Sequence, residues 1–141
     1  MAVDLRGRDF LTLQDFTPEE LLQLIETAYQ LKLERLRGEP HPLLAGKSLA
    51  LVFQKPSLRT RVSFEVGMAQ LGGRSVYLGP DDIQLGKRET TEDIALVLSR
   101  YTDGIMARVF GHDIAAGATI PRGTEKDFLV LLDKEIRDQL T

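Results

Sequence analysis

A short polar segment near the middle of the chain has the composition of an anion-binding loop. The residues Lys55-Pro56-Ser57-Leu58-Arg59-Thr60-Arg61 bring hydroxyls and guanidinium groups together between an apolar run and a segment of helical periodicity. The first N–H groups of a helix lack partners within the helix and carry the positive end of its dipole. Ser57, Leu58, Arg59 and Thr60 are therefore candidates to hold a phosphate group.

The same segment also fits a purely structural role. Ser57 would then cap the helix, while Arg59 and Arg61 would be solvated surface charges, which is the commoner fate of such residues. The spacing alone does not separate the two interpretations.

A second arginine bears on this choice. Arg108 lies in the apolar run Ile105-Met106-Ala107-Arg108-Val109-Phe110, toward the carboxyl end of an expected strand. A charge there is costly unless it is paired, and open parallel sheets bind ligands at the carboxyl ends of their strands. Arg59 and Arg108 are thus expected to converge on one ligand. The alternatives are a strand end that reaches solvent or an ion pair with one of three acidic residues, Glu65, Glu89 and Asp103.

The remaining polar residues give weaker signals. Gln84 lies in a long polar loop over residues 79–89, which is better interpreted as a surface loop when taken alone. His112 has no second histidine nearby and is interpreted as a polar surface residue. Because the chain has no cysteine and only two histidines, no metal centre and no cofactor is expected.

The hydrophobic pattern predicts the elements that would position these residues. Strand, helix, strand, helix and strand follow one another, which is typical of right-handed crossovers in a parallel sheet. We expect an α/β fold, a three-layer domain with a short parallel sheet of three or four strands flanked by helices. The predicted helices cover about 18–36, 59–71, 91–101 and 124–136, and the predicted strands cover 48–53, 75–78 and 105–110.

Length and composition limit the function classes. The chain has 141 residues, of which 43% are hydrophobic and 28% charged, as in a folded single domain. A formal net charge of −3 argues against broad binding to nucleic acid or to an anionic membrane. No apolar run approaches the length of a membrane span, and the first ten residues have no apolar secretory core. A cytoplasmic protein is expected.

The run Lys55-Pro56-Ser57-Leu58-Arg59-Thr60-Arg61-Val62-Ser63-Phe64-Glu65-Val66, followed by Leu71-Gly72-Gly73, resembles the carbamoyl-phosphate-binding signature of the aspartate and ornithine carbamoyltransferases. Further segments look like the ornithine branch of that family: Ile83-Gln84-Leu85-Gly86-Lys87-Arg88-Glu89 with Asp93, Val97-Leu98-Ser99-Arg100-Tyr101, and Asp103-Gly104-Ile105 through Arg108. The resemblance implies a carbamoyl-phosphate-binding domain over about residues 8–112.

The resemblance also implies roles for single residues. Ser57, Leu58, Arg59 and Thr60 would hold the phosphate of carbamoyl phosphate, and Thr60 with Arg108 would contact the carbamoyl oxygen as the catalytic pair. Leu58 stands where many relatives have threonine, so one hydroxyl contact would be missing. In the homotrimer of the family, the residue corresponding to Gln84 reaches into the site of the neighbouring subunit.

The last part of the chain departs from the family pattern. Residues 1–112 are expected to form the carbamoyl-phosphate domain, and residues 113–141 a divergent tail whose terminal amphipathic helix packs on it. The family's His-Pro-x-Gln motif and its ornithine-binding domain are not recognisable. A truncated or engineered chain with a replacement tail is therefore expected.

Three functions remain open. The first is a fragment of an ornithine carbamoyltransferase, an arginine-biosynthetic enzyme that makes citrulline and phosphate; this fragment would bind carbamoyl phosphate, or phosphate, with very low activity alone. The second is a non-catalytic, trimer-forming binding or assembly module. The third is a different phosphate-handling enzyme on the same scaffold, since fold does not fix function.

Overall fold

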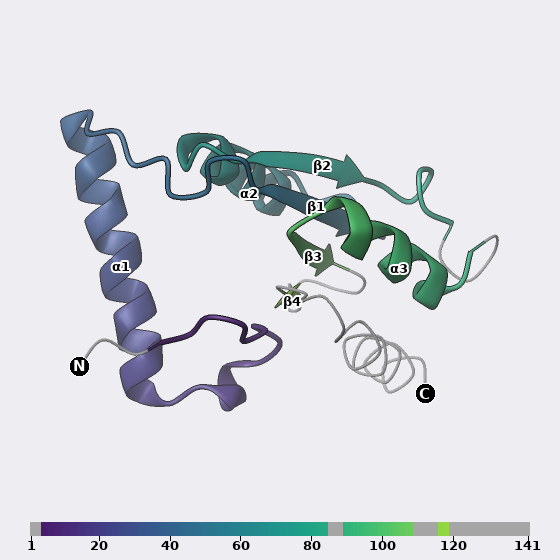
Figure 1. Ribbon diagram of the computed structural model, residues 1–141, viewed down its shortest axis with the longest axis horizontal. Helices are drawn as coiled ribbons and strands as arrows, with labels where there is room; N and C mark the ends of the chain where they lie inside the picture. The colour runs from purple at the N-terminus through teal and green to yellow at the C-terminus, as the bar shows by residue number, and fades with distance from the viewer. Residues whose placement is uncertain (1–3, 85–88, 109–115, 119–141) are drawn as a thin grey trace.

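The computed structural model describes residues 4–84, 89–108 and 116–118 (Figure 1). Its elements in chain order are a 3-10 turn η1 (Leu13–Asp15), α1 (Pro18–Arg37), β1 (Ser48–Phe53), α2 (Leu58–Gln70), β2 (Arg74–Leu78), α3 (Thr91–Tyr101), β3 (Gly104–Arg108) and β4 (Ala116–Ala118). The expected helix over 124–136 and His112 lie outside the described residues. The other predicted helices and strands are present. β1 and α3 have the predicted bounds, the other bounds differ by at most one residue, and residues 109 and 110 of the third predicted strand lie outside the described part.

The four strands within the described residues form one sheet in the order β2-β1-β3-β4. β1 is central and pairs in parallel with β2 and with β3, whereas β4 runs antiparallel to β3. The register places Phe53, the last residue of β1, opposite Arg108, the last residue of β3. The carboxyl ends of the two strands therefore meet at one edge of the sheet.

The alternation of side chains along β1 builds a core on each face of the sheet. Ala50 and Val52 face one side, where they join a buried cluster with Ile94 and Ala95 of α3. Leu51 and Phe53 face the other side in a second buried cluster. Figure 1 shows α3 and α2 on opposite faces. The expected three-layer α/β architecture is confirmed, with three parallel strands and one antiparallel strand.

Two adjacent glycines let the segment before β1 pass close to the turn after α2. Gly72 has a φ of +79°, and a Cβ on it would lie 2.9 Å from the Cβ of Pro42. A Cβ on Gly73 would lie 3.1 Å from the carbonyl oxygen of Leu44. Side chains at these positions would push the two segments apart, which gives a structural reason for the Gly72-Gly73 pair.

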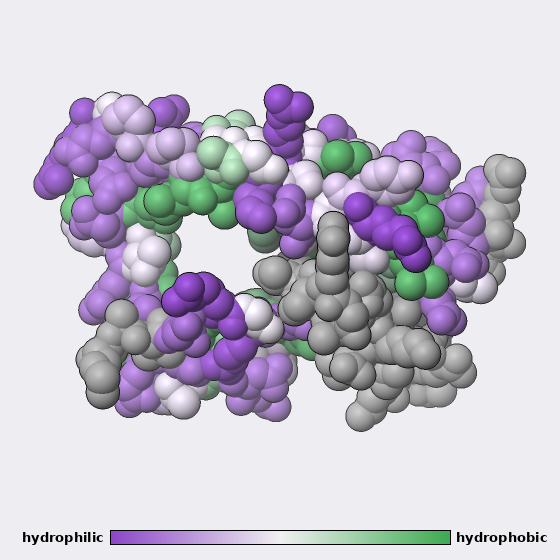
Figure 2. Space-filling view, in the orientation of Figure 1, coloured by the Kyte–Doolittle hydropathy of each residue, from purple (hydrophilic) through white to green (hydrophobic). Residues whose placement is uncertain are grey.

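Helix α1 begins and ends as its sequence predicts. Thr17 and Glu20 form a capping box at its start, and Gly38 ends it in the left-handed conformation with a φ of +73°. No residue of α1 is buried. The helix stands apart from the sheet, and Figures 1 and 2 show an opening between the two. None of the described helices is long and apolar enough to cross a membrane.

Candidate anion-binding site

The loop between β1 and α2 lies against the end of β3. The backbone N–H of Gln54, the first residue after β1, donates to the carbonyl of Arg108 over 2.9 Å. The Gln54 side chain in turn donates to the carbonyl of Ile83 over 3.4 Å, which ties the loop after β2 to the same edge. Gln54 was not singled out from the sequence, although a polar side chain directly after a buried strand could have drawn attention to it.

Three side chains meet at this edge. Nη1 of Arg108 donates to Oγ of Ser57 and, over 2.8 Å, to Oγ1 of Thr60. The Ser57 hydroxyl also donates to the Thr60 oxygen over 3.0 Å. All three residues are half-buried. The expected approach of Arg108 to the Ser57–Thr60 segment is therefore present, across a sequence separation of 51 residues.

Ser57 occupies the N-cap position of α2 without capping it. Its side chain makes no cap hydrogen bond, because the hydroxyl is engaged with Arg108 instead. In contrast, the N-cap hydroxyls of Thr17 and Thr90 each accept an N–H from the first turn of their own helices. The interpretation of Ser57 as a simple cap is thus wrong for its side chain. The first turn of α2 therefore keeps N–H groups that can donate hydrogen bonds to an anion.

Leu58 and Arg59, also expected at the phosphate, point outward. Leu58 is 79% exposed and can offer its backbone N–H. Arg59 is exposed and makes no hydrogen bond or ion pair with the described residues. The structure therefore does not bring Arg59 to Arg108. A solvent-exposed side chain on the first helical turn can still change rotamer toward a ligand.

Arg61 is not the solvated charge that the alternative interpretation assumed. Its Nε is 3.1 Å from a carboxylate oxygen of Glu65, and its guanidinium lies 3.7 Å from the ring centroid of Tyr77. Arg61 thus fixes α2 against β2. Glu65 is engaged by Arg61, and Asp103 is engaged by Lys47 at the opposite edge of the sheet. Two of the three carboxylates considered as partners of Arg108 are therefore paired elsewhere.

Gln84 lies in the loop after β2 and is exposed. It makes no hydrogen bond within the described residues. With Asp81, Asp82 and Glu89 it lines a polar cavity of about 350 Å³. The structure therefore does not join Gln84 to the Ser57–Thr60–Arg108 cluster. Among the described residues, no three acidic or histidine side chains come together as metal ligands would.

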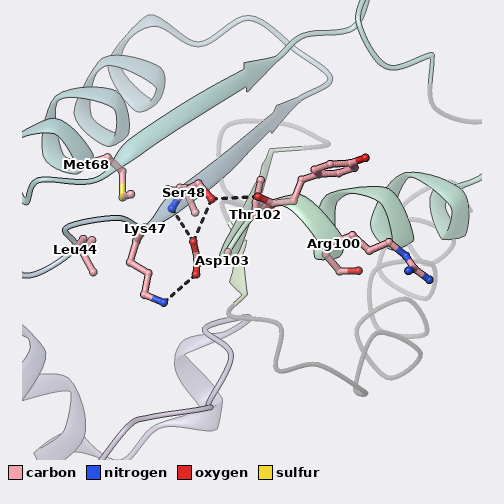
Figure 3. A pocket seen from close by; sticks show the side chains of 11 residues that line it. Leu44, Lys47, Ser48, Met68, Arg100, Thr102 and Asp103 are labelled. Carbon is pink, nitrogen blue, oxygen red and sulfur yellow. Dashed lines mark hydrogen bonds and ion pairs between the residues drawn. The ribbon is translucent and has the colours of Figure 1, made fainter.

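A larger cavity, of about 530 Å³, lies at the amino edge of the sheet (Figure 3). Its polar groups bind one another. The Asp103 carboxylate accepts from the Lys47 ammonium over 2.9 Å and from both the N–H and the hydroxyl of Ser48. These contacts, the Lys47 bond first, lower the pKa of the Asp103 carboxyl. The cluster joins the start of β1 to the start of β3.

The carboxyl edge thus has the parts of a phosphate-binding α/β domain: hydroxyls, a guanidinium and an uncapped helix at the end of parallel strands. Comparison with known proteins identifies the family to which this phosphate-binding α/β domain belongs. The profile described as aspartate/ornithine carbamoyltransferase, carbamoyl-P binding domain, matches residues 8–123. The chain belongs to this family and corresponds to that domain. The match extends past residue 112, where the recognisable motifs ended.

Individual relatives favour the ornithine branch, as the motifs did. The ornithine carbamoyltransferase of Pyrococcus abyssi is 57% identical over 125 residues, which cover 86% of this chain and 39% of that protein. The solved ornithine carbamoyltransferase of Pyrococcus furiosus is 58% identical with a TM-score of 0.74, over 76% of this chain and 34% of that one. The catalytic subunit of M. jannaschii aspartate transcarbamoylase is 35% identical, with a TM-score of 0.62, over 68% and 32% of the two chains. The chain spans about two fifths of the length of the curated relatives it matches.

Proposed function

We propose that this chain binds carbamoyl phosphate at the Ser57–Thr60–Arg108 cluster, as the carbamoyl-phosphate-binding part of an ornithine carbamoyltransferase. The observation that supports this most directly is that the guanidinium of Arg108 donates to the hydroxyls of Ser57 and Thr60 at the N-terminus of α2. The Ser57 side chain makes no capping hydrogen bond to that helix. The cluster therefore offers charge-assisted donors beside free backbone N–H groups, and both suit a phosphate ester or anhydride.

The family resemblance implies how the two ends of the ligand would be divided. The phosphate would accept from the N–H groups of the first turn, with Ser57 and a reoriented Arg59 beside it. The carbamoyl oxygen would face Thr60 and Arg108. When an amine attacks the carbamoyl carbon, negative charge builds on that oxygen, and the bond to the phosphate oxygen breaks. Donors placed at both points stabilise the transition state more than the ground state.

The full transfer to ornithine needs a second group of residues that would hold the amine. Aligning two reactants in one site can supply several kcal/mol of barrier lowering, on the order of 7 or more in favourable cases. We propose that this chain alone forms citrulline far more slowly than a whole enzyme does. The relative from Pyrococcus furiosus described as anabolic supports a place in arginine biosynthesis, which we propose to be cytoplasmic.

Self-association as a homotrimer is part of the same proposal. Leu58, Val62 and Val66 lie four residues apart on one face of α2, and all three are exposed although they are apolar. A neighbouring subunit on this face would lie beside the phosphate cluster, and Gln84 would gain a role across the boundary. The same exposed row favours the second candidate function, a non-catalytic assembly module that keeps the loop as an inherited feature.

Isothermal titration of the 141-residue chain with carbamoyl phosphate, and with inorganic phosphate for comparison, tests the proposal. We expect both to bind, carbamoyl phosphate more tightly, with an affinity that falls as salt is added. Binding of neither ligand by the folded chain would contradict the proposed function and favour the assembly module. Citrulline production from ornithine and carbamoyl phosphate is the second measurement. Turnover like that of a whole enzyme would contradict the proposal that a second group of residues is needed to hold the ornithine amine.

A further inference from the structure

Gln54 connects the ends of three strands at the carboxyl edge. It is the first residue after β1, and its backbone N–H donates to the carbonyl of Arg108, the last residue of β3, over 2.9 Å. Its side-chain Nε2 donates to the carbonyl of Ile83, in the loop after β2, over 3.4 Å. This half-buried residue therefore ties the loop after β2 to the strand end that carries Arg108.

The two polar groups at this edge work on opposite sides of the sheet. Val52 faces the side that α3 covers, and Ile83 belongs to the same buried cluster, with 5% of its surface exposed. The contact with Ile83 places the Gln54 side chain on that side, as expected for a residue two positions after Val52. Phe53 lies between them and faces the α2 side, where Arg108 meets its hydroxyl partners. The Gln54 side chain therefore serves the loop, and other side chains build the anion cluster.

The bond to the Ile83 carbonyl fixes the peptide unit from which Gln84 begins. That carbonyl and the N–H of Gln84 belong to one planar group, so holding one orients the other. The turn before this peptide is held as well. The N–H groups of Asp82 and Ile83 both donate to the carbonyl of Gly79, and the Asp82 carboxylate accepts from the N–H of Gly79 over 2.8 Å. The Gln54 amide thus joins an ordered turn to the carboxyl edge.

We propose that Gln54 is a positioning residue, which holds the loop over residues 79–84 so that the Gln84 amide is presented at a fixed place. The inference rests on the proposed function, in which Gln84 acts at the anion site of a neighbouring copy. Gln84 is exposed and makes no hydrogen bond within the described residues, so its backbone determines where its amide can reach. Fixing that backbone before the ligand arrives lowers the ordering cost of binding.

Hydrogen exchange followed by mass spectrometry tests the hold on the loop in the 141-residue chain. Gln54→Met removes the amide donor and nearly keeps the length of the side chain. The turn should then open more often, so exchange in a peptide that covers residues 79–84 should become about two- to ten-fold faster. Gln30→Met is the matched control, because it removes an amide hydrogen bond of the same kind, to Glu34 within α1 over 3.0 Å. It should leave exchange in the loop unchanged.

Calorimetric titration with carbamoyl phosphate tests whether Gln54 acts through Gln84. Gln84→Ala should raise the Kd by about ten-fold, and Gln54→Met should raise it by about three- to ten-fold but by no more than Gln84→Ala does. When Gln84→Ala is already present, Gln54→Met should add less than about two-fold, because the side chain that it positions is gone. A residue that only stabilised the fold would give the same increase in both backgrounds.

The outcomes that overturn the inference differ from the one that overturns the proposed function. Loop exchange or a Kd that Gln54→Met leaves unchanged would overturn the inference, as would an equal increase in Kd with and without Gln84. A Kd that Gln84→Ala leaves unchanged would also overturn it, while the assignment of the Arg108 cluster would stand. Absence of binding by the folded wild type would contradict the proposed function, and the inference would fall with it.

Discussion

The two edges of the sheet hold similar side chains and use them differently. At the amino edge, the Lys47 ammonium meets the Asp103 carboxylate, and Ser48 completes the group, so charge and hydrogen-bonding capacity are satisfied internally. At the carboxyl edge, the guanidinium of Arg108 holds two neutral hydroxyls, and the helix beside them is uncapped. The ion pair joins two strands, while hydroxyls held by a guanidinium at a helix N-terminus can rotate to contact a ligand. The kind of partner, more than the kind of residue, separates the two edges.

The largest expected effect comes from the packing beside the amino edge. Gly72→Ala adds a Cβ that would lie 2.9 Å from Pro42, at a φ of +79°. The combined strain and overpacking should lower the free energy of unfolding by about 2 to 4 kcal/mol, measured by urea denaturation. Gly38→Ala is the matched control, since Gly38 has a similar φ of +73° with nothing within 4 Å. It should lose only about 1 kcal/mol. Equal losses would show that the contact with Pro42 contributes nothing.

Removing the guanidinium at the carboxyl edge should reduce ligand binding. Arg108→Ala deletes charge-assisted hydrogen bonds worth about 1.5 to 3 kcal/mol, so the Kd for carbamoyl phosphate should rise by about ten-fold to one hundred-fold. Arg100→Ala removes the same charge at the amino-edge cavity and should leave the Kd nearly unchanged. If both variants weaken binding equally, the effect is net charge and the site assignment fails.

A variant that binds carbamoyl phosphate more tightly at the carboxyl edge would further distinguish this edge from the amino edge. Leu58 lies in the first turn of α2 with its side chain exposed, so Leu58→Thr can add a hydroxyl without disturbing the core. One added hydroxyl that donates to the charged phosphate should lower the Kd by about ten-fold in calorimetric titration. Leu58→Val, which has nearly the same shape without the hydroxyl, is the control. A Kd lowered by both variants would exclude the added hydroxyl as the cause.

The smallest effect is the pH dependence of the amino-edge ion pair. The pKa of Asp103 is lowered in the folded chain, chiefly by Lys47, so the carboxylate stabilises the fold above its unfolded pKa. This contribution is lost as the pH falls through the lower, folded pKa. Because the pair is partly exposed, we expect less than about 1 kcal/mol. Asp103→Asn should therefore be less stable than wild type at pH 7, and the difference should shrink toward pH 3. A difference that is constant with pH would contradict the electrostatic cause.

Local patterns in the sequence predicted the elements well, because their signals lie within a few residues. The capping box at Thr17 and the apolar run of β1 are examples, and both elements begin where the pattern places them. The approach of Arg108 to Ser57 was also predictable, since parallel strands end at the same edge. These predictions needed only the chain order and the rule for crossovers.

Contacts that depend on exact packing were not predictable in the same way. The Lys47–Asp103 pair joins residues 56 apart, and nothing in either local pattern points to the other residue. The outward position of Arg59 depends on side-chain rotamers, which periodicity does not specify. The need for glycine at Gly72 and Gly73 comes from the close approach of the segment at Pro42 to the turn after α2, which no local pattern specifies. Such distances follow from the three-dimensional arrangement of the layers.

The pairing of Phe53 with Arg108 in the sheet register ties the ligand to folding itself. A shift of β3 by one residue would turn Arg108 to the other face and separate it from Ser57. Any anion that binds the cluster therefore binds only chains whose central strands are correctly aligned. By mass action, such a ligand at one hundred times its Kd would raise the unfolding free energy by about 2.7 kcal/mol. The bound anion would then act as a selective stabiliser of the correctly folded domain.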